Sequence, residues 1–194
     1  MKFSSELDNA LGVNLRPMPL NPVIRKESNV PSKLAGISES SNSSTDYNSI
    51  FSLVRKTVKS VLGKERVGIG LALANLPGQL GAFWEVGGNY IVMNRNLLDA
   101  LKHANRPIEE VNSFVFVILM HEYLHSLGIL DEYKARATTA RICATIFEEG
   151  HPAYELGTKD PWQVYPFLAY APSGNGENLK IVENFDSDSV SYIM

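Results

Sequence analysis

The 194-residue sequence contains a single cysteine, Cys143, so no disulfide bond can form within the chain. This excludes a fold held together by disulfide bridges and favours a reducing compartment. Residues 1–14 include Glu6 and Asp8 and lack a continuous apolar segment, so they do not resemble a secretory signal peptide. We therefore expect a cytoplasmic protein in which Cys143 is a small residue of the core.

Long hydrophobic runs are also absent. The longest, Phe114 to Met120, is far shorter than the roughly 20 residues that a membrane-spanning helix requires, so it predicts a buried helix and no membrane association. The net charge of -3 arises from 18 basic and 21 acidic side chains that are mixed along the chain. Because the basic residues form no cluster, the sequence gives no indication of nucleic-acid binding.

The composition of residues 1–44 differs from that of the rest of the chain. Apolar residues make up 44% of the whole sequence and charged residues 20%, as in ordinary globular proteins. Residues 16–44, however, are rich in proline and then in serine and asparagine, and such a segment buries too little apolar surface to offset its ordering entropy. We therefore expect residues 1–44 to form a flexible arm, which is either a plain tail or a pro-segment lying across the active-site cleft. Residues 45–194 are expected to form one folded domain.

Apolar spacing and turn residues predict the elements of this domain. We expect a helix capped by Thr45 or Asp46 and ended by Gly63, a buried strand over Val67–Ala74, a hairpin of Ala82–Val86 and Tyr90–Asn94, and helices over 97–101, 108–127 and 131–149. This order predicts an α+β fold, in which a small mixed sheet packs on a long central helix that is backed by the next helix. The region from Trp162 to Met194 gives no clear pattern.

The segment His121-Glu122-Tyr123-Leu124-His125 carries the clearest chemical signal. Residues four apart on an α-helix lie one turn apart on the same face, so His121 and His125 can direct ring nitrogens at one metal ion. Glu122 projects near the same position, where a carboxylate can accept a proton from a metal-activated water and pass it to a leaving amine. The segment therefore predicts a hydrolytic metal centre, and two histidines with one carboxylate suit zinc.

The match extends to His125-Ser-Leu-Gly128-Ile-Leu-Asp131, so that the whole reads HExxHxxGxxD. This pattern resembles that of the metzincin metallopeptidases, and the stretch HEYLHSLGILDEYKAR is similar to small uncharacterised archaeal metallopeptidases. The resemblance implies a zincin-like fold, one zinc ion held by His121, His125 and Asp131, and Glu122 as the catalytic base. It also implies that the protein is a metalloendopeptidase whose substrate is a peptide or protein. Metzincins carry a Met-turn followed by a further helix, whereas here only Ser191 to Met194, at the end of the sequence, could provide that turn.

Two other residues are alternatives to Asp131 as the third ligand. The predicted helix begins directly at Asp131, which would make this residue an ordinary N-cap. The motif is then similar to that of the gluzincins, in which an acidic residue of the following helix completes the zinc site, and Glu132 is the candidate. His151 ranks third, because a straight helix would place it roughly 27 Å from the start of that helix.

Other residues are candidates for roles around this centre. The resemblance implies that Tyr90–Asn94 is the edge strand along which an extended peptide binds. Tyr165, Tyr170 and Tyr192 are candidate oxyanion stabilisers, and their spacing selects none of them. Arg136 lies four residues after Glu132 and can either pair with it on the helix surface or orient it as a ligand. The alternative from another functional class is a catalytically silent module in which a structural metal site supports binding of a partner.

Overall fold

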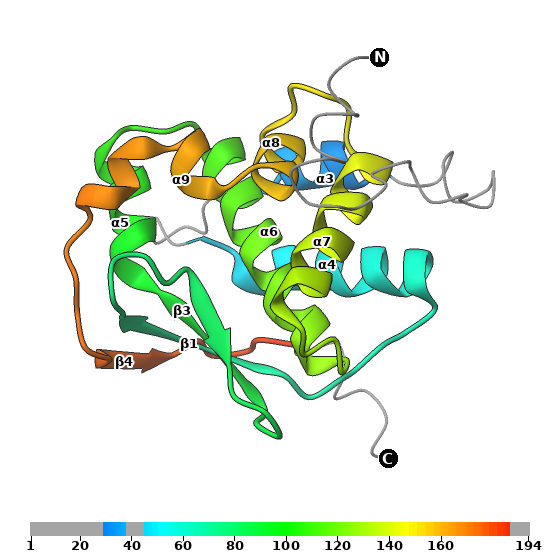
Figure 1. The fold of residues 1–194 in the computed structure, drawn as a ribbon, viewed down its shortest axis with the longest axis horizontal. Helices are drawn as coiled ribbons and strands as arrows, with labels where there is room; N and C mark the ends of the chain where they lie inside the picture. Colours follow the sequence, from blue (N-terminus) through cyan, green and yellow to red (C-terminus); the bar gives the residue numbers. More distant parts are fainter. Residues whose placement is uncertain (1–28, 38–44, 187–194) are drawn as a thin grey trace.

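The computed structural model describes residues 29–37 and 45–186. The described chain combines helices with a small sheet, which confirms the α+β class (Figure 1). The elements follow in the order α3 (Val30–Ala35), α4 (Tyr47–Leu62), β1 (Gly70–Asn75), β2 (Ala82–Trp84), β3 (Tyr90–Asn94), α5 (Arg95–His103), α6 (Ile108–Ser126), α7 (Glu132–Ile146), α8 (Pro152–Thr158), α9 (Pro161–Val164), the 3₁₀ helix η1 (Pro166–Tyr170) and β4 (Glu177–Ile181).

The sheet contains four described strands in the order β2-β3-β1-β4. Strands β2 and β3 form the predicted antiparallel hairpin, in which Ala82 pairs with Met93 and Trp84 with Ile91. Strand β1 lies parallel to β3 on its other side, and β4 is antiparallel to β1. The sheet is therefore mixed, and β2 forms one of its two edges.

Helix α6 is the central element of the domain, with the sheet below it in Figure 1 and helices α7 and α8 beside it. Glu109 and Glu110 lie in its first turn, where acidic side chains interact favourably with the positive end of the helix dipole. Most of its apolar side chains are fully buried, on all sides of the helix, because sheet and helices cover it together. The predicted buried helix is thus confirmed.

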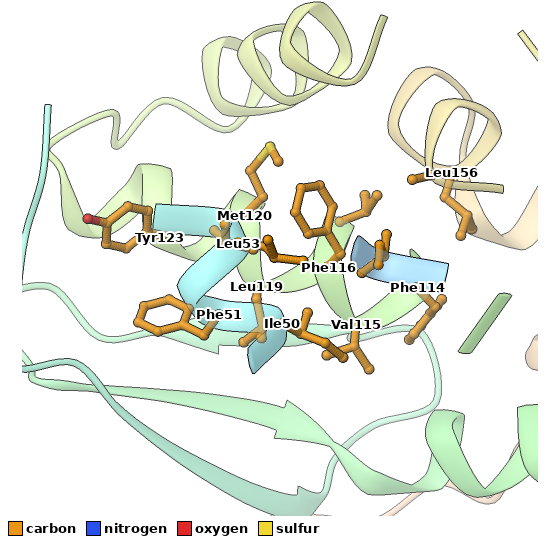
Figure 2. Packing of buried hydrophobic residues seen from close by; sticks show 14 of the residues in the cluster. Ile50, Phe51, Leu53, Phe114, Val115, Phe116, Leu119, Met120, Tyr123 and Leu156 are labelled. Atoms are coloured by element: carbon orange, nitrogen blue, oxygen red, sulfur yellow. The ribbon is translucent and has the colours of Figure 1, made fainter. Parts of the chain in front are cut away.

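Helix α4 packs against α6, and Figure 2 shows buried apolar side chains of both helices side by side. Asp46 caps the first turn of α4, and Gly63 ends the helix with a φ of 66°. The spacing of its apolar residues by three and four gives the helix one buried face, which packs on α6. The ring of Phe51 meets the ring of Tyr123 edge-to-face, with centroids 5.4 Å apart. This packing fixes the helix turn that also carries the two histidines of the motif.

The expected flexible arm needs correction over residues 29–37, where the structure has helix α3 packed on α6. Leu34 is fully buried, and the amide of Asn112 in α6 donates hydrogen bonds to the carbonyls of Leu34 and Ile37 at 3.1 and 2.8 Å. Pro31 is compatible with this helix because it lies in the first turn, where its missing N–H has no partner to lose. The rest of the arm, residues 1–28 and 38–44, lies outside the described residues.

After Gly150, where the sequence predicts no further helix or strand, the fold continues through α8, α9, η1 and β4. Helix α8 packs closely on α7, since a Cβ at Gly157 would lie 2.4 Å from the sulfur of Cys143. Cys143 is fully buried, as expected of a core residue, and burial raises the pKa of its thiol to about 12. Among the described residues, every helix is too short or too polar to cross a lipid bilayer.

Candidate metal centre

The last two turns of α6 bring His121 and His125 together. Their Nε2 atoms lie 3.1 Å apart, and the two rings meet edge-to-face with centroids 4.7 Å apart. Both side chains are largely buried, with exposed fractions of 17% and 15%. Burial lowers the pKa of His121 below its ordinary value, which keeps this ring neutral and available as a metal ligand near neutral pH.

The way α6 ends orients His125. Gly128 has a φ of 93°, and the N–H groups of Gly128 and Ile129 donate to the carbonyls of His125 and Leu124, so the helix closes with a Schellman motif. This turn brings the carbonyl of Ile129 to within 2.8 Å of His125 Nδ1. Because a carbonyl oxygen can only accept, Nδ1 must carry the proton. In the neutral ring Nε2 is therefore unprotonated, with its lone pair directed at the other residues of the centre.

Glu132 completes the group. Its Oε2 atom lies 3.2 Å from the Nε2 atoms of both His121 and His125. This residue is the first of α7, which starts beside the end of α6 because the chain reverses at Gly128. The structure thus brings the second-ranked candidate, Glu132, to the histidines.

The first-ranked candidate, Asp131, has a different position. Its side chain caps α7 by accepting a hydrogen bond from the backbone N–H of Lys134 at 2.8 Å. The carboxylate is therefore engaged with the helix terminus, and Asp131 does not belong to the group around the histidines. His151, the third candidate, likewise caps α8, where its Nδ1 accepts a hydrogen bond from the N–H of Ala153 at 3.0 Å.

The three atoms contributed by His121, His125 and Glu132 fit a divalent cation in chemistry and in spacing. Their mutual distances are 3.1 to 3.2 Å, and tetrahedral zinc with bonds of about 2.1 Å separates neighbouring ligand atoms by roughly 3.4 Å. In the neutral tautomer of His125, the lone pair of Nε2 faces the carboxylate oxygen of Glu132, so that both atoms are available to the same cation.

Arg136 holds the carboxylate of Glu132 from the opposite side. Its Nε atom donates to Oε1 at 2.7 Å, which leaves Oε2 directed at the histidines. Although partial burial by itself would raise it, the pKa of Glu132 is lowered, chiefly by the hydrogen bond from Arg136 and the neighbouring His121. The carboxylate is therefore ionised and oriented, as metal ligation requires.

We expect Arg136→Gln to weaken zinc binding by roughly tenfold, the lower end of the range for partners of metal ligands, because half of the Arg136 side chain is exposed. Competition with a chromophoric chelator measures this affinity. Lys134→Gln, at an exposed position of the same helix, is the matched control and should retain the wild-type affinity. An Arg136→Gln variant that binds zinc as tightly as the wild type would mean that Glu132 keeps its orientation without this ion pair.

Glu122 lies on the inner side of the centre. Only 6% of the residue is exposed, and burial raises the pKa of its carboxyl to about 7, against the opposing effects of His125 and of the backbone N–H of Trp84. A cation held by the neighbouring histidines would favour the ionised form. Glu122 is thus a buried carboxylate whose proton affinity is matched to proton transfer near neutral pH.

The expectation that Tyr90–Asn94 is the edge strand is wrong, because β3 is paired on both sides and β2 is the edge. Asn94 N–H donates to the carbonyl of Gly81 at 2.9 Å. Since hydrogen-bonded pairs alternate along an antiparallel ladder, the backbone groups of Ala82 and Trp84 point away from β3 toward the free edge. This edge faces Glu122, with which the N–H of Trp84 interacts.

A pocket of about 670 Å³ opens beside the centre. His121, Glu122 and Glu132 lie in its wall together with the start of β2, and Val117 and Ile118 of α6 contribute apolar surface. The opposite wall is the segment from Leu156 to Gln163, at the junction of α8 and α9, which includes Trp162. No residue of this wall was predicted from the sequence. One signal was present, because an Asp before a Pro often starts a helix, and Asp160 does cap α9.

Neither of the described tyrosines proposed for an oxyanion role lines this pocket. The hydroxyl of Tyr165 donates to Glu110 at 2.7 Å, and the side chain of Tyr170 is 90% exposed elsewhere on the surface. Tyr192 and the segment Ser191 to Met194 lie outside the described residues. The structure therefore supports neither Tyr165 nor Tyr170 as a stabiliser of developing charge.

Comparison with known proteins finds no matching family model, no matching curated protein and no matching solved structure.

Proposed function

We propose that the protein is a zinc-dependent metallopeptidase in which His121, His125 and Glu132 hold one zinc ion and Glu122 is the catalytic base. The observation that carries this proposal is the convergence of three ligand atoms, within 3.2 Å of one another, beside a buried carboxylate at an open pocket. The proposal replaces Asp131 by Glu132 in the ligand set that the sequence favours.

The residues divide the chemistry between them. Zinc held by His121, His125 and Glu132 would lower the pKa of a water to about 7 and polarise the carbonyl of the scissile bond. Glu122 accepts the proton that the attacking water loses and delivers it to the nitrogen of the leaving amine. The N–H of Trp84 holds this carboxylate in place.

The surroundings of the centre suit an extended peptide. The backbone groups of Ala82 and the carbonyl of Trp84, which point to the free edge, can add a substrate strand to the sheet and align the scissile bond by main-chain hydrogen bonds. The pocket between β2, α6 and the α8–α9 segment offers apolar contact to a substrate side chain through Ile118 and Trp162. Such a site favours a polypeptide over a small polar substrate.

A structural metal site in a silent module is the alternative, and Glu122 argues against it. Burying a carboxylate is unfavourable, and a metal site that only stabilises the fold gains nothing from a carboxylate beside the ligands. A structural zinc site also usually has four protein ligands, whereas three of the described residues converge here and the site opens into a pocket.

The test compares the cleavage of an unfolded protein such as casein by the wild type and by Glu122→Gln, with the zinc content of each measured. We expect both proteins to hold one zinc ion per chain, and cleavage by Glu122→Gln to be slower by roughly 10²- to 10⁴-fold, because the proton acceptor is lost. Glu109→Gln, in the first turn of the same helix and away from the centre, should cleave at the wild-type rate.

Two results would contradict the proposal. Equal cleavage by the wild type and by Glu122→Gln would show that the activity does not depend on this carboxylate. Zinc bound by both proteins with no cleavage of casein or of a mixed peptide library would favour the silent module.

A further inference from the structure

Arg66 connects the end of the histidine helix to the loop of the β2-β3 hairpin. It lies between α4 and β1, outside both of the elements that it joins. Its Nη1 atom donates to the carbonyl of Ser126, the residue after His125, at 3.1 Å. Its Nη2 atom donates at 2.9 Å both to the carbonyl of Gly88 and to the side-chain oxygen of Asn89. One planar guanidinium therefore bridges the two elements that form the site.

The backbone of Arg66 is fixed to the same helix by Tyr123. The Tyr123 hydroxyl accepts a hydrogen bond from the N–H of Arg66 at 2.7 Å and donates one to its carbonyl at 2.9 Å. Tyr123 is fully buried and lies between the two histidines in sequence. Main chain and side chain of Arg66 are thus both attached to the last turns of α6.

On the other side, Arg66 supports the edge strand through Trp84. The guanidinium carbon lies 5.3 Å from the centre of the Trp84 ring, a cation–π arrangement. The indole N–H of Trp84 donates to the carbonyl of Gly88 at 2.9 Å, the same carbonyl that Arg66 binds. Trp84 is the residue whose backbone N–H faces Glu122.

We propose that Arg66 is a positioning residue, which holds the free edge of β2 in register with His121, Glu122 and His125 so that a bound peptide is aligned for cleavage. The inference rests on the proposed peptidase function. The hydrogen bonds of Arg66 go to Tyr123, Ser126, Gly88 and Asn89 and not to the side chains of the three ligands, so it acts on alignment of the substrate and leaves the metal site intact. Lysine cannot replace it fully, because an ammonium group lacks the planar fork that reaches Ser126 and Gly88 together.

The test measures zinc affinity, kcat and KM for Arg66→Gln and Arg66→Lys on a peptide that the wild type cleaves. We expect zinc affinity within about threefold of the wild type and kcat/KM lower by roughly 10- to 100-fold in Arg66→Gln, mainly through a higher KM, because a small displacement of a positioning element costs this much. Arg66→Lys should recover part of the loss, since it keeps the charge over Trp84.

A second measurement follows the edge strand directly. In a Trp162→Phe background, used for fluorescence only, Trp84 is the sole tryptophan. We expect the neutral quencher acrylamide to quench its emission several-fold more strongly in Arg66→Gln than in the Arg66 background, because the indole loses the guanidinium that covers it.

The matched control is Arg106→Gln. Arg106 also lies 5.3 Å from an aromatic ring, that of Tyr165, and forms an ion pair with Glu110, but it lies away from the centre. We expect Arg106→Gln to lower the free energy of unfolding in urea about as much as Arg66→Gln does. Its kcat, its KM and the quenching of Trp84 should stay at the wild-type values.

The outcomes separate this inference from the proposed function. Wild-type KM and Trp84 quenching in Arg66→Gln would overturn the positioning role, and so would an equal rise of KM in Arg106→Gln. A loss of zinc affinity in Arg66→Gln would also overturn it, because Arg66 would then support the ligands. If the wild type cleaves no peptide, the proposed function fails. The quenching experiment still decides whether Arg66 fixes β2.

Discussion

Replacing Glu132 with alanine is expected to weaken zinc binding by roughly 100-fold or more. Loss of a residue that is hydrogen-bonded to a metal ligand lowers metal affinity by about 10- to 100-fold, and loss of a direct ligand lowers it further. Replacing Asp131 with alanine should leave zinc affinity within about threefold of the wild type and lower the free energy of unfolding by about 1 kcal/mol, the cost of a lost N-cap. The two neighbouring carboxylates thus have separable roles, since one faces the histidines and the other caps α7.

Chelator competition and urea unfolding of both variants measure the two effects. Asp131→Asn is a further control, because asparagine caps a helix as well as aspartate does and should retain both wild-type values. If Asp131→Ala lost zinc while Glu132→Ala bound it tightly, the third ligand would be Asp131, as the metzincin resemblance implies. That result would contradict the geometry described above.

Replacing Asp186 with alanine is expected to lower the free energy of unfolding by roughly 3–5 kcal/mol, as for one partner of a buried ion pair. Asp186 lies past β4 and pairs with Arg55 of α4, and the exposed fractions of the two side chains are 2% and 12%. Its other oxygen accepts hydrogen bonds from the N–H groups of Gly68 and Ile69 at 2.8 and 3.3 Å. The substitution leaves a largely buried guanidinium, the buried N–H of Ile69 and the N–H of Gly68 without this partner.

Urea unfolding followed by circular dichroism measures this loss. Glu65→Ala is the matched control, because Glu65 also pairs with Arg55, at 2.8 Å, but its side chain is 30% exposed. We expect the control to cost at most about 1 kcal/mol, as for an exposed pair. Equal losses in the two variants would show that the ion pair of Asp186 contributes no more than a surface contact.

Local signals in the sequence were sufficient for the helices around the centre. Asp46 and Gly63 bound α4 as predicted, because capping and a left-handed terminus depend on residues adjacent in sequence. The histidine pair on α6 follows from helix periodicity alone. Which carboxylate faces the histidines depends on where α7 starts after the chain reverses at Gly128. The sequence motif favoured Asp131 as the third ligand, whereas the structure brings Glu132 to the histidines.

Features that depend on distant contacts were missed. The hairpin of β2 and β3 joins sequence neighbours and was predicted, but the insertion of β1 beside β3 makes β2 the edge. Strand β4 has five exposed residues and thus no alternation of buried and exposed positions that a sequence pattern could reveal. Helix α3 follows a region rich in proline, and only the spacing of Val30 and Leu34 with Pro31 in the first turn indicates it.

The most direct test of the account is a crystal structure of the protein with zinc, in which anomalous scattering at the zinc edge locates the ion. The account predicts one strong peak within about 2.0–2.2 Å of Nε2 of His121, Nε2 of His125 and one carboxylate oxygen of Glu132. A peak bound to Asp131 in place of Glu132, or the absence of any peak between the two histidines, would contradict it.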